Sequence, residues 1–469
     1  MDLSELTVTE TIKGLYQKKF SSVDITRSLF EKIKPLDKKI KAFVTIDSEN
    51  ALKKAEEADE KRKKGDARPF LGVPFTLKDN ICTQGLRTTA SAKVLENYIP
   101  QYDATISKKL KDAGVVILGK TNMDAWAHGS STETSDFFTT LNPWDLEKLP
   151  GGSSGGSAAT VAADLTIGSI GTETAGSIRQ PASWCGVVGL KPTYGRVSRY
   201  GIISMGSSLD SPGPMTKTVE DAALTLPVIA GKDPQDATTS SIKLDDYLVN
   251  LKKGVKNLKV GISEEYQKIA EPIVREAVEK ALKTIEKLGA IIVPVKLLDP
   301  TYSISVYTIL QRAEVSANLA RYDGIRYGEG REKFGEEAKR RIMLGTYALS
   351  AGYYDALYGK AQQIRTLIVE DFKKVFQKID CIIAPTTPCV ALPLGSSKTS
   401  PMFGEVQDVL VEPSTIAGLP GITLRCGFVG ELPIGIQIIG PQFSEALILK
   451  VAYAYEQNTD WHKRKPNII

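Results

Sequence analysis

Residues 151–186 read GGSSGGSAATVAADLTIGSIGTETAGSIRQPASWCG, in which two serine-glycine loops flank an apolar segment. Glycines leave room for backbone N–H groups to converge on one point. A serine hydroxyl is a weak nucleophile until a base accepts its proton and hydrogen-bond donors stabilise the resulting oxyanion. The stretch therefore raises two questions: whether one of its serines attacks a substrate, and which residue takes the proton.

The segments around this stretch alternate short apolar runs with amphipathic helices. GVPFTLKDNI (72–81), GVVILGKTNM (114–123) and GVVGLKPTYGRVS (186–198) are typical of buried strands, with glycine and proline marking their ends. The run DATISKKLKDAG (103–114) predicts a helix that ends at Gly114 and leads into a strand. Together these patterns predict an α/β core.

Outside this core, helical periodicity dominates. We expect residues 1–65 to form an N-terminal helical layer, with Ser21 or Ser22 as an N-cap and a charged helix that stops at Gly65. Residues 66–469 are interpreted as one α/β domain without a clear linker. Its parts are a catalytic core (66–230), a mainly helical part (231–380) and a return to the sheet (381–469). A helix with apolar residues from Ile273 to Leu288 lies in the second part.

Composition excludes several classes of protein. Sixty Lys and Arg residues against 55 Asp and Glu residues give a net charge of +5, which does not predict nucleic-acid binding by the chain itself. Five scattered cysteines form no metal or disulfide pattern and suit a reducing cytoplasm. The N-terminus lacks signal-peptide character, and no apolar run is long enough to cross a membrane. We expect no resident metal, and neither membrane nor DNA as a partner.

The loops allow more than one interpretation. Phosphate binding is disfavoured because no G-x-x-x-x-G-K-[ST] pattern is present, and a nucleophile elbow, G-x-S-x-G, is missing around Ser177. Tight turns with a purely structural role remain open. If a serine is a nucleophile, its base is unusual, because the chain has only two histidines, His128 and His462. Lys78, after an apolar strand-like run, would serve if burial lowered its pKa, although a lysine at a strand end more often faces solvent.

Taken together, Lys78, Ser153 and Ser177, with the block GGSSGGSAA…GTETAGSIRQPASWCGVVGLKPT, resemble the amidase-signature family over nearly the whole chain. The resemblance implies a single large α/β domain whose mixed, twisted sheet is covered by helices on both faces. It also implies a Ser–Ser–Lys triad, with Ser177 as nucleophile, Ser153 in a cis peptide bond as proton relay and Lys78 as base. Ser154 would support the triad, and the N–H groups of Thr174, Ala175, Gly176 and Ser177 would form the oxyanion hole.

Later blocks are similar to the tRNA-dependent amidotransferase branch of this family, among them residues 195–214, 340–368 and 415–422. This resemblance implies a glutaminase without a cofactor of its own. Its ammonia would pass to amidotransferase subunits B and C, which would use ATP and Mg²⁺ to amidate misacylated Glu-tRNA(Gln) or Asp-tRNA(Asn). Arg341 and Asp408 would bind the α-carboxylate and α-ammonium of glutamine, and Tyr307 would add a hydroxyl.

The sequence departs from the family pattern in two places, and two alternatives to the amidotransferase function stay open. His128 stands in MDAWAHGSS where the family commonly has a methionine, and LQRAEVSANL is also atypical. A stand-alone amidase acting on small amides would share the triad without needing Arg341 and Asp408. A non-enzymatic scaffold protein would keep the fold alone, although all three triad positions are intact here.

Overall fold

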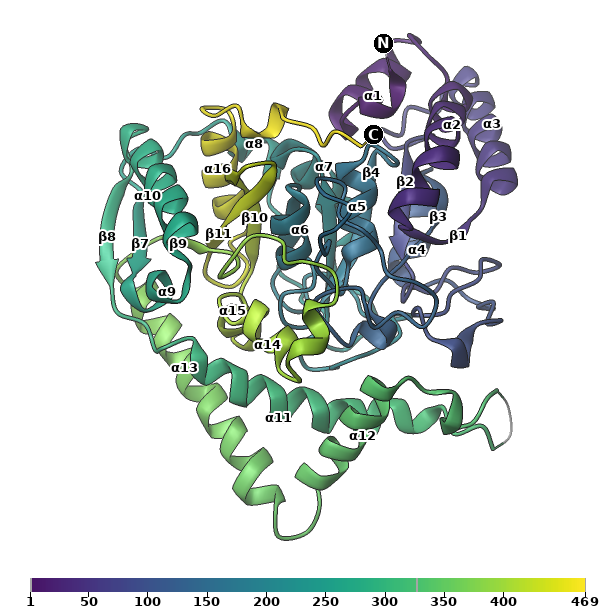
Figure 1. Ribbon diagram of the computed structural model, residues 1–469. Helices are drawn as coiled ribbons and strands as arrows, with labels where there is room; N and C mark the ends of the chain where they lie inside the picture. Colours follow the sequence, from purple (N-terminus) through teal and green to yellow (C-terminus); the bar gives the residue numbers. More distant parts are fainter. Residues whose placement is uncertain (1, 326–327, 469) are drawn as a thin grey trace.

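One mixed sheet of 11 strands runs through the chain in the computed structural model, which describes residues 2–325 and 328–468 (Figure 1). Its strand order is β1-β3-β2-β4-β6-β5-β10-β11-β9-β7-β8. β2 is parallel to β3 and β4, and β7 is parallel to β8 and β9, whereas the remaining neighbours are antiparallel. The strands are β1 (Phe43–Ile46), β2 (Pro74–Lys78), β3 (Val116–Thr121), β4 (Gly168–Glu173), β5 (Val188–Lys191), β6 (Ser211–Thr216), β7 (Lys259–Ser263), β8 (Ile291–Val295), β9 (Cys381–Pro385), β10 (Gly421–Val429) and β11 (Leu432–Ile439).

Helices cover both faces of this sheet, which confirms the predicted fold class. α5 and α6 pack together on β4, β5, β6 and β10, whereas α7 and α16 pack together on the other side of β5, β6 and β10. The helices are α1 (Val8–Tyr16), α2 (Ser22–Ile40), α3 (Ser48–Lys63), α4 (Thr105–Asp112), α5 (Gly155–Ala162), α6 (Arg179–Cys185), α7 (Val219–Ile229), α8 (Tyr247–Leu251), α9 (Glu264–Ile269), α10 (Pro272–Lys287), α11 (Thr301–Asn318), α12 (Glu336–Ala348), α13 (Lys360–Phe376), α14 (Phe403–Asp408), α15 (Glu412–Ile416) and α16 (Glu445–Glu456).

The first 65 residues form α1 to α3, but they also contribute β1, which sequence analysis assigned to no strand. Four residues are too few to show a strand period, and β1 is fixed instead by its antiparallel pairing with β3. Ser21 caps α2 as expected, since its hydroxyl accepts the Asp24 N–H at 3.0 Å and Asp24 reaches back to the Ser21 N–H at 2.8 Å.

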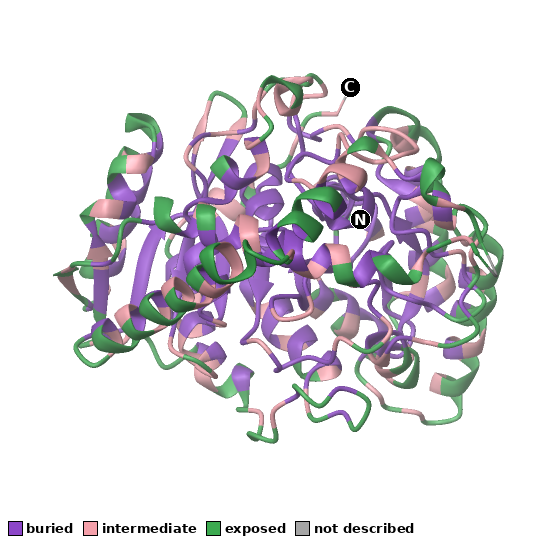
Figure 2. Cartoon of the chain, turned by 90° about the horizontal axis from the view of Figure 1, so that it is seen from below, coloured by how far each residue is buried: buried purple, intermediate pink, exposed green. Residues whose placement is uncertain are grey.

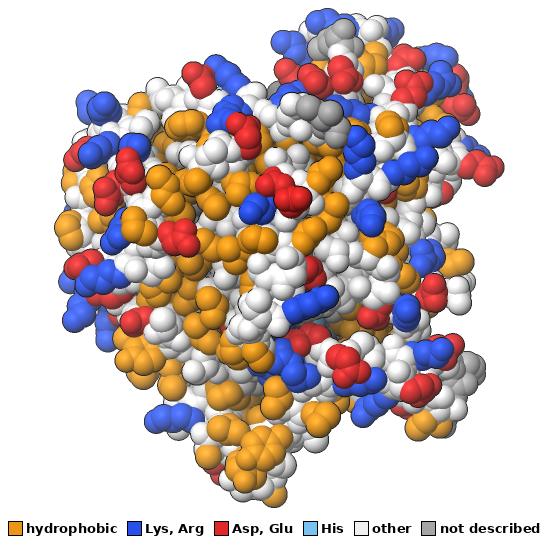
Figure 3. Space-filling model, viewed as in Figure 1, with side chains coloured by type: hydrophobic (Ala, Val, Ile, Leu, Met, Phe, Trp, Pro, Cys, Tyr) orange, Lys and Arg blue, Asp and Glu red, His pale blue; other side chains and the backbone are white. Residues whose placement is uncertain are grey.

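The predicted helical part, 231–380, contains α11, α12 and α13, which project from the body of the molecule (Figure 1). Apolar side chains gather at the projecting end (Figure 3). Among the exposed apolar residues of α12 are Met343 and Tyr347, at 71% and 49%. Ile273, expected on the buried face of α10, is 44% exposed because it lies in the first turn, whereas Val274 beside it is buried.

Both serine-glycine loops lie in the interior. Figure 2 shows the central strands as buried, and Ser153, Ser154 and Ser177 are each at most 4% exposed. The chain thus holds several hydroxyl groups away from bulk water at the centre of its sheet. Over the described ranges, no helix combines the length and hydropathy that crossing a membrane would require.

Candidate active site

Lys78 ends β2, and its side chain is fully buried. Nζ donates hydrogen bonds to Ser153 Oγ at 2.7 Å and to the Thr172 carbonyl oxygen at 3.0 Å. Burial lowers the pKa of Lys78 to about 7, although three nearby carboxylates oppose this shift. Around neutral pH, about half of these amines are therefore uncharged and able to accept a proton.

Ser153 and Ser154 precede α5, and a cis peptide bond joins Gly152 to Ser153. This is the cis bond that the family resemblance implied. Gly152 has no room for a side chain, since a Cβ there would collide with Asp124 Oδ2. Ser154 Oγ donates to the Thr172 carbonyl at 3.1 Å, the same oxygen that Lys78 contacts. The loop therefore places both hydroxyls around the end of β2.

Ser177 lies in the loop between β4 and α6, where the backbone leaves donors free. Within the described part of the chain, the N–H groups of residues 174–177 donate no hydrogen bond to a protein group, although all four residues are buried. Buried N–H groups nearly always have a partner, so four consecutive free ones indicate a place for an oxygen from outside the chain. They are the four residues predicted to form the oxyanion hole, a role that remains a prediction.

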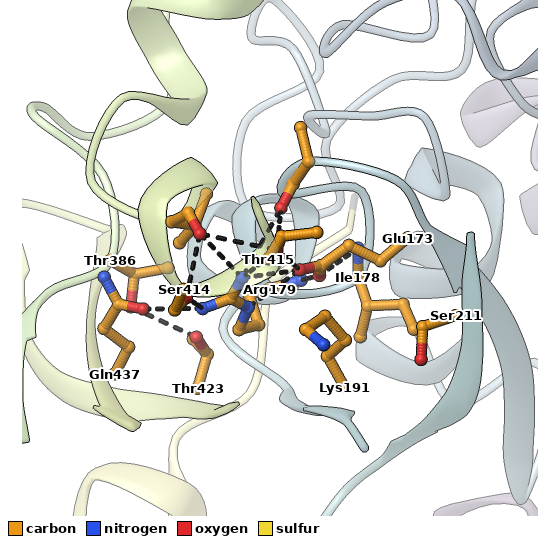
Figure 4. A network of polar contacts seen from close by, with 12 residues as sticks. Glu173, Ile178, Arg179, Lys191, Ser211, Thr386, Ser414, Thr415, Thr423 and Gln437 are labelled. Carbon is orange, nitrogen blue, oxygen red and sulfur yellow. Dashed lines mark hydrogen bonds and ion pairs between the residues drawn. The ribbon is translucent and has the colours of Figure 1, made fainter. Parts of the chain in front are cut away.

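A buried ion pair between Glu173 and Arg179, which lie on either side of Ser177 in the chain, holds this loop (Figure 4). Glu173 Oε2 accepts the N–H groups of Ile178 and Arg179, both at 3.0 Å, and its Oε1 accepts from Arg179 Nη2 at 2.6 Å. Arg179 Nη1 also donates to Gln437 Oε1 at 2.8 Å and Ser414 Oγ at 2.9 Å. Sequence analysis missed this pair, whose signal is two opposite charges six residues apart on either side of Ser177.

The two loops are joined, but the predicted relay is not complete. Ser154 N–H donates to the Ser177 carbonyl at 3.2 Å, and Lys78 contacts Ser153. Among the hydrogen bonds of the described residues, none joins the hydroxyls of Ser153 and Ser177. Catalytic hydrogen bonds are often long or misaligned before substrate binds. The structure therefore shows the Lys78–Ser153 half of the relay and leaves the second half open.

A cavity of about 310 Å³ is lined in part by Arg341, a residue of α12. Glu337, one turn earlier, accepts from Arg341 Nε at 2.5 Å and so orients the guanidinium. Arg341 Nη1 is buried and has no hydrogen-bond partner among the described residues. A fixed cation with a free donor is suited to binding a carboxylate.

Asp408 connects this cavity with the Ser177 loop. Its Oδ2 accepts from Ser130, which lines the cavity, at 2.7 Å. Its Oδ1, which has no partner in the described ranges, lies so close to Gly176 that a Cβ on that residue would collide with it. Burial raises the pKa of Asp408 well above its ordinary value. The structure thus brings Arg341 and Asp408 to the same region.

Three residues that sequence analysis singled out, Tyr307, His128 and His462, differ in how they relate to this site. Tyr307 is buried on α11, close enough to Arg341 and Asp408 for their charges to act on its pKa, which burial raises. His128 lines the cavity, and burial lowers its pKa well below the ordinary value. His462 lies near the C-terminus, where its carbonyl accepts from Arg425. Neither histidine hydrogen-bonds to Ser177 in the described structure, and no described group of His, Cys, Asp or Glu side chains could hold a metal.

This fold and this site define an enzyme of the amidase class. The family model described as Amidase matches residues 24–449, and the chain belongs to that family. Over the full length of both chains, it is 50% identical to the A subunit of the Glutamyl-tRNA(Gln) amidotransferase of Carboxydothermus hydrogenoformans.

Solved structures agree with this membership. The crystal structure of the corresponding Glutamyl-tRNA(Gln) amidotransferase chain, also an A subunit, from Thermotoga maritima matches with a TM-score of 0.84 and 41% identity, covering 100% of this chain and 99% of that one. The native peptide amidase of Stenotrophomonas maltophilia matches with a TM-score of 0.86 and 31% identity over 98% of each chain. The predicted family is therefore confirmed, and members with different names share the fold.

Proposed function

We propose that this chain is the glutamine-hydrolysing subunit of a tRNA-dependent amidotransferase. The observation that carries the choice of substrate is the placement of Arg341 and Asp408: Arg341 lines the cavity, and Asp408 lies between the cavity residue Ser130 and Gly176 of the Ser177 loop. Free glutamine bears an α-carboxylate and an α-ammonium, for which an arginine and an aspartate are the matching partners. The 50% identity to a protein of that name, over both full lengths, supports the same conclusion.

In the proposed reaction, Ser177 Oγ attacks the side-chain amide carbon of glutamine. Its proton passes to Ser153 Oγ, whose own proton moves to the neutral amine of Lys78, and the free N–H groups of residues 174–177 hold the oxyanion. Lys78 then returns a proton through Ser153 to the leaving nitrogen, and ammonia departs. Water next attacks the resulting γ-glutamyl ester of Ser177 and releases glutamate.

The ammonia is consumed outside this chain. Subunits B and C would provide the site at which ATP and Mg²⁺ activate the side-chain carboxylate of Glu-tRNA(Gln), or of Asp-tRNA(Asn). The near balance of charge in this chain, +5 over 469 residues, fits a subunit that leaves most tRNA contacts to its partners.

The test is glutamine hydrolysis and tRNA amidation by the chain with partner subunits B and C. Ser177→Ala should abolish glutamate release, whereas the matched control Ser169→Ala, a buried serine bonded to Thr76 in the sheet, should retain it. Both Glu-tRNA(Gln) and Asp-tRNA(Asn) are supplied in separate reactions. Rapid hydrolysis of simple aliphatic amides by the single chain, with no turnover of glutamine, would show a stand-alone amidase instead.

A further inference from the structure

The ring of His128 is unusual among buried side chains of this protein. It is 1% exposed, and in the described part of the chain neither Nδ1 nor Nε2 has a hydrogen-bond partner. His128 lines the same cavity as Arg341, whose Nη1 is also buried without a partner. Buried polar atoms are usually paired within the protein, so unpaired atoms on two residues that line one cavity point to a ligand from outside the chain.

The segment that carries His128 is fixed by its neighbours. The ring of Trp126 stacks on Phe334 with centroids 5.3 Å apart and also packs against Tyr322 at 5.0 Å. Thr134 Oγ1 donates to the His128 carbonyl at 3.1 Å. The backbone at position 128 is therefore held on both sides, beside the cavity that His128 helps to line.

The surroundings of His128 define which ligand group it suits. Burial, together with the charges of Arg341 and Arg312, lowers its pKa well below the ordinary value. The ring is therefore neutral at working pH, with one N–H donor and one acceptor nitrogen. A donor beside cations matches an anionic oxygen of the ligand better than an ammonium.

We propose that the imidazole of His128 donates a hydrogen bond to the α-carboxylate of the amide substrate, beside Arg341, and is a specificity-determining residue. The inference rests on the proposed function, because it assigns the cavity to the amino-acid end of glutamine. The reacting amide lies at the other end of the substrate, beside Ser177. His128 therefore contributes to substrate binding and not to the proton relay.

The test compares His128→Met and His128→Gln with the wild-type chain, each in complex with the partner subunits. Methionine has nearly the volume of histidine but no N–H, whereas glutamine keeps a donor. Two substrates are assayed: glutamine, and butyramide, which has the amide but neither α-group. H128M should raise the KM for glutamine about 10- to 100-fold with little change in kcat, and leave butyramide hydrolysis unchanged. H128Q should recover part of the loss.

A second measurement does not depend on how the His128 variants fold. Because the chain has two histidines, ¹⁵N-histidine spectra of the Ser177→Ala complex should show a ring-nitrogen shift for His128, and none for His462, on adding glutamine. An unshifted His128 resonance at saturating glutamine, an unchanged KM in H128M, or equal losses on both substrates would overturn the inference. Absence of glutamine turnover by the wild-type complex would refute the proposed function itself.

Discussion

The pH dependence of catalysis tests the central chemical step most directly. At pH 7 an ordinary lysine is neutral in about one molecule in 3,000, whereas Lys78, with a pKa of about 7, is neutral in about half. In the proposed relay, only the neutral amine of Lys78 accepts the proton that Ser153 passes on. We therefore expect kcat/KM for glutamine to rise about tenfold between pH 6 and pH 8 and to level off above that range.

A neighbouring carboxyl provides the control for this assignment. Asp210 accepts from Thr174 Oγ1 at 2.5 Å, its negative charge raises the pKa of Lys78, and its own pKa is raised to about 6 by burial. In Asp210→Asn the rising limb should move to lower pH if it belongs to Lys78, because an opposing charge is removed. If the limb belongs to Asp210 itself, it should vanish.

The assay is steady-state glutamate release by the complex from pH 5.5 to 9, with the stability of each variant checked over the same range. A flat profile in the wild type, or loss of the limb in D210N, would refute the view that a neutral Lys78 is the base. A rate that is still rising steeply at pH 9 would show instead that the amine is solvated during turnover, with a pKa nearer the ordinary lysine value.

Three further predictions concern stability and substrate binding. Lys78→Met should unfold at a temperature about 5 °C higher at pH 7 and lose this advantage by about pH 10.5. Between pH 7 and 10.5 the unfolded chain binds a proton at Lys78 that the folded chain does not, because the folded pKa is about 7. This difference lowers the free energy of unfolding of the wild type by an amount on the order of 5 kcal/mol at pH 7. Equal melting temperatures of the two proteins at both pH values would contradict this. Arg341→Lys should raise the KM for glutamine about tenfold or more but not that for butyramide, since a lysine cannot reproduce a guanidinium fork; an unchanged KM would remove Arg341 from the carboxylate site. Arg179→Met should cost about 3–5 kcal/mol of unfolding free energy by leaving Glu173 buried and unpaired, and Glu173→Met in the same chain should recover part of it; wild-type stability of the single variant in chemical denaturation would show that the pair does not hold the loop.

Local patterns were enough to predict several elements of the fold. The capping residues of α2 and the apolar run of β2 act within a few neighbours along the chain, so the sequence shows them directly. The order of the strands depends instead on distant pairings, such as β10 with β5, and no local pattern carries it. β1 was missed for the same reason, since its four residues become a strand only against β3.

The residues of the candidate site also differ in whether local sequence or distant contacts reveal them. Ser153 and Ser177 were found because their loops have a distinctive local composition, whereas the burial of Lys78 depends on the strands at its sides, β3 and β4. The partners of Arg179 include Ser414 and Gln437, which lie more than 200 positions away in the chain. Their hydroxyl and amide groups have no local signature, so this support could be seen only in three dimensions.

The distribution of paired and unpaired polar groups explains how this site is kept ready for substrate. On either side of Ser177 in the chain, Glu173 and Arg179 hydrogen-bond to each other and to backbone and side-chain groups on several elements. By contrast, the N–H groups of residues 174–177 and Asp408 Oδ1 have no hydrogen-bond partner in the described structure. A free buried donor costs about 1–3 kcal/mol, which an unrestrained loop would recover by bending until its own carbonyl groups accepted those bonds. The buried ion pair prevents this rearrangement, because any shift of the loop would separate Glu173 from two backbone N–H groups at once. In the proposed oxyanion hole, the substrate oxygen would then supply the missing acceptor without first displacing a protein group, which is the condition for strong oxyanion stabilisation.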